Sequence, residues 1–224
     1  MDRLHRIALL IGNEAVIKLQ KSTVMVVGCG AVGSFAIESL ARSGVGHIIV
    51  VDFDVVEESN INRQLFALDS TIGMPKVEVA GMRIADINPK IKVDIINVFF
   101  DENTVLKAKP DFVIDAIDTV SSKIALYKWC MNNAVPFVSS MGAARKTDLT
   151  KIKTGKISKT TVCPLASKIR RMVRDLKMPD FPVVYSTESA SPQPNGGREF
   201  GSCVSVTGTF GLMLSDFVIK KLIS

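Results

Sequence analysis

The sequence is poor in the residues that build disulfide-linked or zinc-linked scaffolds. Its 224 residues include only two histidines, and its four cysteines are widely scattered without any C-x-x-C pair. A zinc ribbon needs such paired ligands, and a disulfide framework needs closely spaced cysteines in a short secreted chain. We therefore expect reduced thiols, no zinc and a cytoplasmic location. The four cysteines are Cys29, Cys130, Cys163 and Cys203.

The sequence also lacks the signals of export and of membrane insertion. No basic and apolar leader with a small-residue cleavage site opens it, so we expect no export. The apolar run Val204–Ile219 contains Ser, Thr and Asp216 and is short for a bilayer. That run favours a buried strand or helix, and we expect no membrane association.

Apolar stretches and amphipathic stretches alternate along the first 140 residues. With 47% hydrophobic residues, the chain has enough apolar side chains for one sizeable core. The alternation predicts an α/β fold: a Rossmann-like, doubly wound, mainly parallel sheet with helices on both faces, plus a C-terminal extension. We expect strands at 24–27, 47–51, 92–98, 112–115 and 136–140, and helices at 31–43, 75–88 and 120–134.

The regular alternation stops near Gly142, where glycine, proline and charged residues become frequent. The segment Ser186–Arg198 contains two prolines and a Gly-Gly pair, which predicts a mobile loop.

A glycine motif follows the first expected strand. Gly28, Gly30 and Gly33 have the G-x-G-x-x-G spacing and lie between an apolar strand and a helical pattern. At this spacing the first glycine permits a tight turn, the second lets the backbone approach a phosphate, and the third lets the helix pack closely. Asp52 ends the second strand about 20 residues further on, where a ribose hydroxyl needs an acceptor. The motif predicts a nucleotide site, and a glycine-rich turn without a ligand is the alternative.

The next polar segment favours ATP cleavage over hydride transfer. A dehydrogenase has no need of the run that contains Asn60 and Arg63, whereas a planar guanidinium and an amide suit phosphate oxygens. Lys76 opens the next helix and adds a point charge for a leaving pyrophosphate. Asp115 and Asp118 follow the strand at 112–115, so both lie at a carboxyl edge of the sheet. Asp118 is a candidate Mg²⁺ ligand, because magnesium at nucleotide sites uses one or two carboxylates plus phosphate oxygens.

Positive charge is concentrated in one segment. Residues 145–177 contain eleven Lys and Arg against two Asp, whereas the rest of the chain has 17 basic and 20 acidic residues. A solvated helix and loop is the simpler interpretation, but such confinement favours a polyanionic partner. Cations along one helix suit phosphates better than bases. The candidate RNA-binding residues are Lys159, Lys168, Arg170, Arg171 and Arg174.

These motifs together resemble the ThiF-like adenylating enzymes, which include relatives of ubiquitin-activating enzyme and the bacterial activators of sulfur-carrier proteins. The matching pieces are Gly28-x-Gly30-x-x-Gly33, Val51-Asp52-x-Asp54, Ser59-Asn60-Ile-Asn62-Arg63-Gln64, Gly73-x-x-Lys76 and Asp115-x-x-Asp118. The resemblance implies that Asp52 holds the ribose of ATP and that Asp118 binds Mg²⁺. The remaining residues that it assigns to ATP are Gly28, Gly30, Gly33, Asp54, Asn60, Arg63, Gln64 and Lys76. Of these, it implies a catalytic role for Arg63 and Lys76, together with Asp118.

The same resemblance implies a homodimer. In such a dimer an arginine near the N-terminus reaches into the neighbouring site. Arg6 is the matching residue here, and Arg3 is the alternative if the register differs by one turn.

Within this superfamily the chain most resembles the family of tRNA threonylcarbamoyladenosine dehydratases. The carrying residues are Arg3–Arg6, Ile117–Lys123, Ser139–Ala143 and Ile157–Ala166. The resemblance implies an ATP-dependent cyclising dehydration of threonylcarbamoyladenosine in tRNA, through an acyl-adenylate on the threonyl carboxylate. Its partner is then tRNA carrying that nucleoside, and no DNA is expected. In this interpretation residues 1–142 form the ATP-binding adenylation region, and residues 143–224 complete the same domain.

Two other functions remain open. One is adenylation of the C-terminal glycine of a small ubiquitin-like sulfur carrier, against which stands the missing zinc pattern. The other is a nucleotide-binding regulator without catalysis, which would not need the full set of phosphate-contacting residues. The sequence leaves open whether a monovalent cation joins the site and whether Cys163 or Cys203 has any role. Neither cysteine has a recognisable histidine partner, so buried or incidental thiols are the default.

Overall fold

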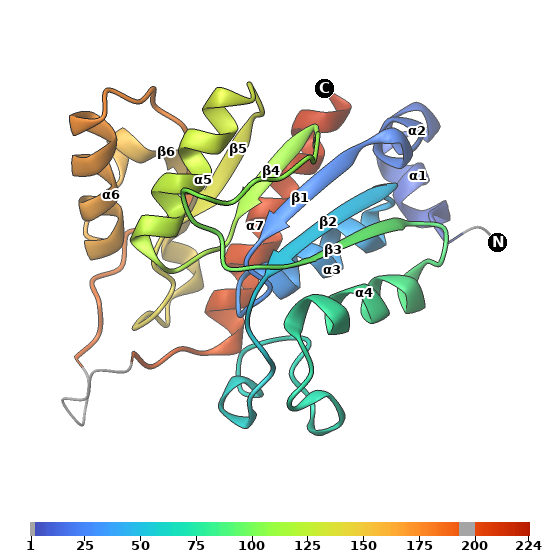
Figure 1. Ribbon diagram of the computed structural model, residues 1–224, viewed down its shortest axis with the longest axis horizontal. Helices are drawn as coiled ribbons and strands as arrows, with labels where there is room; N and C mark the ends of the chain where they lie inside the picture. The colour runs from blue at the N-terminus through green and yellow to red at the C-terminus, as the bar shows by residue number, and fades with distance from the viewer. Residues whose placement is uncertain (1–2, 193–199) are drawn as a thin grey trace.

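The computed structural model describes residues 3–192 and 200–224. Within them the chain forms one seven-stranded sheet covered by helices (Figure 1). The strands are β1 (Thr23–Val27), β2 (His47–Asp52), β3 (Lys92–Asn97), β4 (Phe112–Asp115), β5 (Phe137–Ser140), β6 (Ile152–Lys156) and β7 (Pro182–Ser186). The helices are α1 (His5–Ile11), α2 (Asn13–Lys21), α3 (Gly33–Ser43), α4 (Lys76–Ile87), α5 (Val120–Asn132), α6 (Pro164–Asp175) and α7 (Val204–Ile223). Short 3₁₀ turns at 58–60, 69–71, 149–151 and 157–159 connect them.

The sheet confirms the predicted fold class. Its strand order is β3-β2-β1-β4-β5-β7-β6, and every neighbouring pair is parallel except β6 and β7. The chain runs from β1 outward to β3 and then returns to the other side of β1 at β4. Such a reversal opens a crevice beyond the carboxyl ends of β1 and β4, where open α/β sheets bind ligands.

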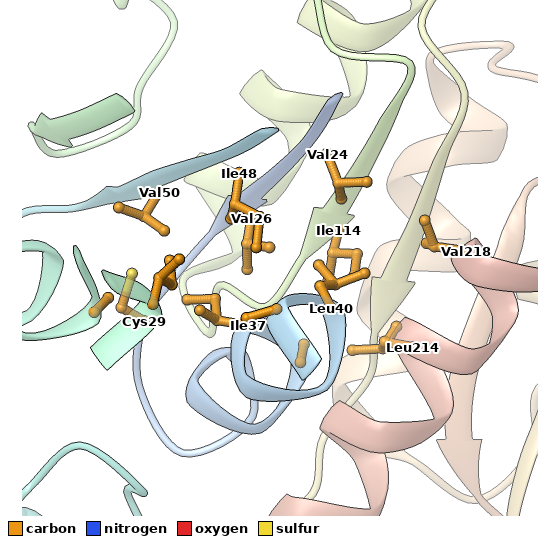
Figure 2. Packing of buried hydrophobic residues seen from close by; sticks show 14 of the residues in the cluster. Val24, Val26, Cys29, Ile37, Leu40, Ile48, Val50, Ile114, Leu214 and Val218 are labelled. Atoms are coloured by element: carbon orange, nitrogen blue, oxygen red, sulfur yellow. The ribbon is translucent and has the colours of Figure 1, made fainter. Parts of the chain in front are cut away.

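Alternating side chains of the central strands fill two separate core layers. Val24 and Val26 of β1 face α3 and α7, as Figure 2 shows together with Ile114 of β4. Met25 and Val27 point to the opposite face, where α5 and α6 cover the sheet. Strands buried on both faces appear in sequence as continuous apolar runs. For this reason β1, β2, β4 and β5 were predictable, whereas β3 is a partly exposed edge strand.

The C-terminal apolar run folds as helix α7 and packs along α3 in the core. Gly211 makes this approach possible, because a Cβ atom there would lie 2.3 Å from the carbonyl oxygen of Val32. Val206, Phe210 and Leu214 are fully buried. In the described part of the chain, no helix combines the length and the apolar character needed to cross a bilayer.

The structure adds four elements that the alternation did not predict. Helices α1 and α2 lie at the amino ends of β1 and β2, and strands β6 and β7 extend the sheet beyond residue 142. β6 is an edge strand of mainly exposed polar residues, so its pattern carries no apolar signal. Of the predicted mobile loop Ser186–Arg198, residue 186 ends β7 and residues 187–192 have no regular structure; residues 193–198 lie outside the described part.

Candidate functional site

A cavity of about 840 Å³ lies at the carboxyl edge of the sheet, beyond β1, β2 and β4. It contains the glycine turn and the polar segment that the sequence singles out. Nine of the predicted site residues line it: Gly28, Gly30, Asp52, Asp54, Asn60, Arg63, Gln64, Lys76 and Asp118. Segments separated by almost 100 residues in the sequence thus meet at one place.

The three glycines of the motif have different surroundings. Gly28 has a φ of +98°, and a Cβ atom there would lie 2.7 Å from the carbonyl oxygen of Ala116. A Cβ atom on Gly33 would lie only 1.7 Å from the carbonyl oxygen of Gly28, so this glycine lets α3 start against the turn. Gly30 faces the cavity, and the nearest atom to an added Cβ is Nε2 of Gln64 at 3.8 Å. The space beside Gly30 is therefore available to a ligand.

Asp52 holds the backbone around the cavity. Its Oδ2 accepts a hydrogen bond from the Cys29 amide at 2.5 Å, and its Oδ1 accepts bonds from the amides of Phe53 and Asp54. The carboxylate thus ties the glycine turn after β1 to the end of β2. Burial, together with the Asp52 charge, raises the pKa of the Cys29 thiol well above its usual value, although Lys76 acts in the opposite direction. Cys29 is also buried, as unreactive structural cysteines are.

The two cations predicted to bind phosphates are held by neighbouring groups. Lys76 is buried, and its Nζ lies 2.9 Å from Oδ2 of Asp54. Arg63 is half-buried, and its Nη1 donates to the carbonyl oxygen of Ser59 at 2.7 Å and to Oδ1 of Asn62 at 2.8 Å. The other guanidinium nitrogens carry further N–H groups that suit a phosphate.

Asn60 shapes the turn that presents Arg63. Its side chain is buried, and Oδ1 accepts a bond from the Glu57 amide at 3.3 Å. The backbone amides of Arg63 and Gln64 both donate to the Asn60 carbonyl oxygen. A single polar turn therefore places three of the predicted ATP residues against the cavity.

Asp118 lies exposed at the cavity, just before α5. The hydroxyl of Thr119 donates to its Oδ1 at 3.2 Å. The described residues contain no group of three or more His, Cys, Asp or Glu side chains that could enclose a metal ion. A single accessible carboxylate fits Mg²⁺ that completes its coordination with phosphate oxygens and water.

Sequence reasoning missed a buried polar network that joins the two ends of the segment carrying Asp118. Lys123 Nζ lies 2.7 Å from Oδ2 of Asp115, and both side chains are fully buried. The Ser139 hydroxyl donates to the same carboxylate and contacts the Tyr127 hydroxyl at 2.7 Å. Burial, and then the Asp115 charge, raises the pKa of Tyr127. Lys123 appeared in the sequence only as part of a family motif, because spacing alone does not show that it turns inward.

The far side of the cavity is lined by residues that the sequence singled out only through the family resemblance or not at all. Met141 and Gly142 follow β5, and a Cβ atom on Gly142 would lie 3.2 Å from Sγ of Cys163. Cys163 is buried at the start of α6. Arg145 has a φ of +60° and lies over the ring of Phe200, 5.8 Å from its centroid. The second cysteine considered, Cys203, is half-buried and does not line the cavity.

The predicted basic helix is confirmed as α6, and it borders a second cavity of about 930 Å³. Four of the five predicted RNA-binding residues line this groove, namely Lys168, Arg170, Arg171 and Arg174, and Lys159 lies on the adjoining 3₁₀ turn. Among the described residues, no acidic side chain forms an ion pair with the first three, and Arg174 pairs with Asp175 at 3.6 Å. Asp180 also lines the groove, where it accepts hydrogen bonds from Ser158.

Arg170 differs from the other groove cations, because its Nη1 donates to the Thr160 carbonyl oxygen at 2.7 Å. It therefore also fastens α6 to the preceding turn. Pro164 lines both cavities, so the first turn of α6 is the wall between them.

Arg6 does not lie in the cavity of its own chain. It is exposed on α1, at the amino end of the sheet, whereas the cavity lies at the carboxyl end. Arg3 donates to the carbonyl oxygen of Ile87 at the end of α4. Either arginine can meet a site of this type only in a second subunit.

The ThiF family model matches residues 2–224 of the chain. The tRNA threonylcarbamoyladenosine dehydratase of Bacillus subtilis is 46% identical over 193 residues, which cover 84% of this chain and 76% of that protein. The structure of the Escherichia coli tRNA N6-threonylcarbamoyladenosine dehydratase in complex with ATP superposes with a TM-score of 0.92 at 35% identity, covering 99% of this chain and 93% of that one. The molybdopterin-synthase adenylyltransferase of E. coli is 41% identical over 135 residues, 59% of this chain and 52% of that protein.

Proposed function

The chain belongs to the ThiF family, and from that premise we propose that it is an ATP-dependent tRNA threonylcarbamoyladenosine dehydratase. The observation that carries the proposal is the single cavity in which the glycine turn, Asn60, Arg63, Lys76 and Asp118 meet. Likeness to the dehydratases extends over nearly the whole chain, whereas the likeness to the carrier-activating adenylyltransferase covers 59% of it. The substrate would be tRNA that carries threonylcarbamoyladenosine.

The proposed reaction has two steps and uses no protein nucleophile. An oxygen of the threonyl carboxylate attacks the α-phosphorus of ATP, and the bond to the bridging oxygen breaks, so pyrophosphate leaves with the electron pair. The neighbouring carbamoyl group then attacks the activated carbonyl carbon, loses a proton and expels AMP. The ring closes, and the nucleoside has formally lost one water.

Positioning and charge stabilisation are the tasks left for the protein. Gly30 leaves room for the phosphates, and Asp52 holds the turn that surrounds them. Arg63 and Lys76 contribute positive charge where negative charge develops on the phosphates. Lys76 is already held against Asp54, so little reorganisation of its side chain is needed.

Asp118 is the residue that would hold Mg²⁺. When bound, the ion supplies positive charge that stabilises the phosphate oxygens during transfer. Asp118 offers this ion an accessible carboxylate, which matches the way magnesium is shared between protein and nucleotide.

For the RNA we propose the groove along α6. Lys168, Arg171 and Arg174 line this groove, and among the residues that the structure describes the one carboxylate paired with them is Asp175, 3.6 Å from Arg174. Because the first turn of α6 forms the wall between groove and cavity, RNA phosphates held in the groove would bring a neighbouring nucleotide to the ATP site. Lys159 and Arg170 extend this basic surface, the latter with one N–H already engaged.

We further propose a homodimer in which Arg6 of one subunit enters the site of the other. The distance of α1 from its own cavity supports this arrangement, because Arg6 has no route to the site within one chain. An arginine supplied in trans would add a second planar donor to the phosphates.

The test is ATP-dependent AMP release by the purified protein, with tRNA that either carries or lacks threonylcarbamoyladenosine. Mass analysis of the digested nucleosides should show the loss of one water only when ATP and modified tRNA are both present. Arg63→Ala should abolish this turnover without changing thermal unfolding, since Arg63 is half-buried and contributes mainly to the site. An unchanged nucleoside with a competent tRNA and an active control enzyme would favour activation of a carrier protein instead.

A further inference from the structure

The buried ion pair between Lys123 and Asp115 has no part in the proposed chemistry. Both side chains are fully buried, and neither lines the cavity. A buried ion pair usually gives little net stability, because desolvation of two charges offsets their attraction, and apolar residues of similar volume often serve equally well. We therefore expect that this pair of charges serves to fix the positions of the backbone segments that it joins.

The pair closes the segment that carries Asp118. Asp115 is the last residue of β4, and Lys123 lies in the first turn of α5, so the two ends of the segment 115–123 are joined by the 2.7 Å contact. Asp115 also accepts a hydrogen bond from the Ile117 amide at 3.0 Å through Oδ1. These contacts hold both ends of the segment, and they also hold the backbone at Ile117, the residue that precedes the exposed Asp118.

Lys123 also reaches the second loop of the cavity. Its Nζ donates to the Ser140 carbonyl oxygen at 2.8 Å and lies 3.3 Å from the Ser139 hydroxyl. Ser140 and Met141 line the cavity on the side away from the glycine turn. All three N–H groups of the ammonium are thus used, and one side chain joins the two neighbouring loops that follow β4 and β5.

We propose that Lys123 is a positioning residue that acts through Asp118, because it holds the segment 115–123 at a set distance from the loop after β5. The inference rests on the proposed role of Asp118 in binding Mg²⁺ with ATP. Lys123 does not line the cavity, so its effect on the site must pass through the backbone of this segment.

The decisive measurement is the dissociation constant of ATP, determined by calorimetry with Mg²⁺ and again with EDTA. The wild-type protein should bind ATP more tightly with Mg²⁺, and Asp118→Asn should lose this gain. Lys123→Met should reduce the gain by about tenfold, the equivalent of one displaced charge-assisted contact, and leave the affinity without Mg²⁺ unchanged. The double variant should bind like Asp118→Asn alone, because the two changes act on the same contact.

Three further variants separate positioning from general damage. Lys123→Arg keeps the charge and should restore part of the gain, whereas Lys128→Met changes an exposed lysine of the same helix and should bind ATP like the wild type. If Lys123→Met does not fold, the double variant Asp115→Asn with Lys123→Met removes both buried charges and should fold with the same loss of the Mg²⁺ gain.

An equal loss of affinity with and without Mg²⁺, or additive effects of Asp118→Asn and Lys123→Met, would overturn the proposal. A normal Mg²⁺ gain in Asp118→Asn would remove its premise. Because the readout is ATP binding, these outcomes do not depend on whether tRNA is the substrate.

Discussion

Alanine substitutions at Gly30 and Gly33 should separate ATP binding from folding. The two glycines lie three residues apart in one motif, but their surroundings differ. A Cβ atom on Gly30 would meet nothing closer than Nε2 of Gln64 at 3.8 Å, which is an ordinary contact. A Cβ atom on Gly33 would lie 1.7 Å from the Gly28 carbonyl oxygen, so the backbone must move by more than an ångström. Each substitution thus serves as the control for the other.

Gly30→Ala should fold normally and bind ATP poorly. Its φ is not in the left-handed region, so alanine adds no backbone strain and restricts the unfolded chain, which is worth about 0.4–1 kcal/mol in favour of folding. In the occupied site the added methyl group stands where the phosphates approach. Overpacking of this kind costs about 1–3 kcal/mol, which corresponds to a dissociation constant that is roughly 5-fold to 150-fold higher.

Gly33→Ala should instead lower stability. Losses above about 4 kcal/mol arise from clashes of this severity, and for a domain of this size they lower the melting temperature by roughly 10 °C or more. The assay is thermal unfolding followed by circular dichroism, with ATP titration calorimetry below the transition. Wild-type ATP affinity in Gly30→Ala, or wild-type stability in Gly33→Ala, would refute the assignment of cavity and packing roles to the two glycines.

Three further results are expected. Arg6→Ala and Asp118→Ala should each be inactive. A mixture of the two proteins should regain turnover, because one of the two sites in a mixed dimer has both residues. No recovery of turnover would exclude an arginine acting in trans. Arg171→Gln should raise the KM for tRNA and lower the slope of log affinity against log salt by about 0.9 while ATP affinity stays constant, and an unchanged slope would remove this residue from the RNA surface. Burial opposes ionisation of Glu38, but hydrogen bonds led by that from Arg83 outweigh it and hold the Glu38 pKa below its ordinary value. Glu38 thus contributes stability above its unfolded pKa of about 4.3 and loses it as the pH falls through the folded pKa. Urea unfolding of Glu38→Gln should show a deficit below about 1 kcal/mol at pH 7, because the pair is partly exposed, and the deficit should vanish in acid.

The central sheet was predictable because its strands are buried on both sides. Residues 24–27 and 47–51 are unbroken apolar runs, and a glycine motif marks where the first of them ends. β7 is also buried, but it pairs with the polar edge strand β6 and is followed by a segment that contains two prolines. The pairing of β7 with β5 joins residues that are far apart in the sequence, so no local sequence pattern predicts it.

The lining of the cavity was predictable where its residues belong to sequence motifs at the ends of strands. Arg63 and Asp118 belong to the polar segments that follow strands, so their meeting at the carboxyl edge follows from parallel topology. Lys123 gave no such signal, since a lysine in the first turn of a helix is usually solvated. Its inward direction depends on Asp115 and Ser139, which face each other in the β4–β5 register. Sequence patterns along single strands do not predict which residues of β4 and β5 lie opposite each other.

Asp52 combines a structural role with the ligand-binding role that its motif predicts. The sequence pattern assigns its carboxylate to a ribose, yet the structure has both oxygens bonded to backbone amides, one of them that of Cys29 in the glycine turn. Each carboxylate oxygen has a further lone pair, so these bonds leave capacity for a hydroxyl group. The same side chain therefore joins the ends of β1 and β2 and faces the cavity beside Gly30. Loss of the carboxylate would release the glycine turn as well as remove the contact that we propose to a ribose, so the shape of the cavity depends on the same side chain.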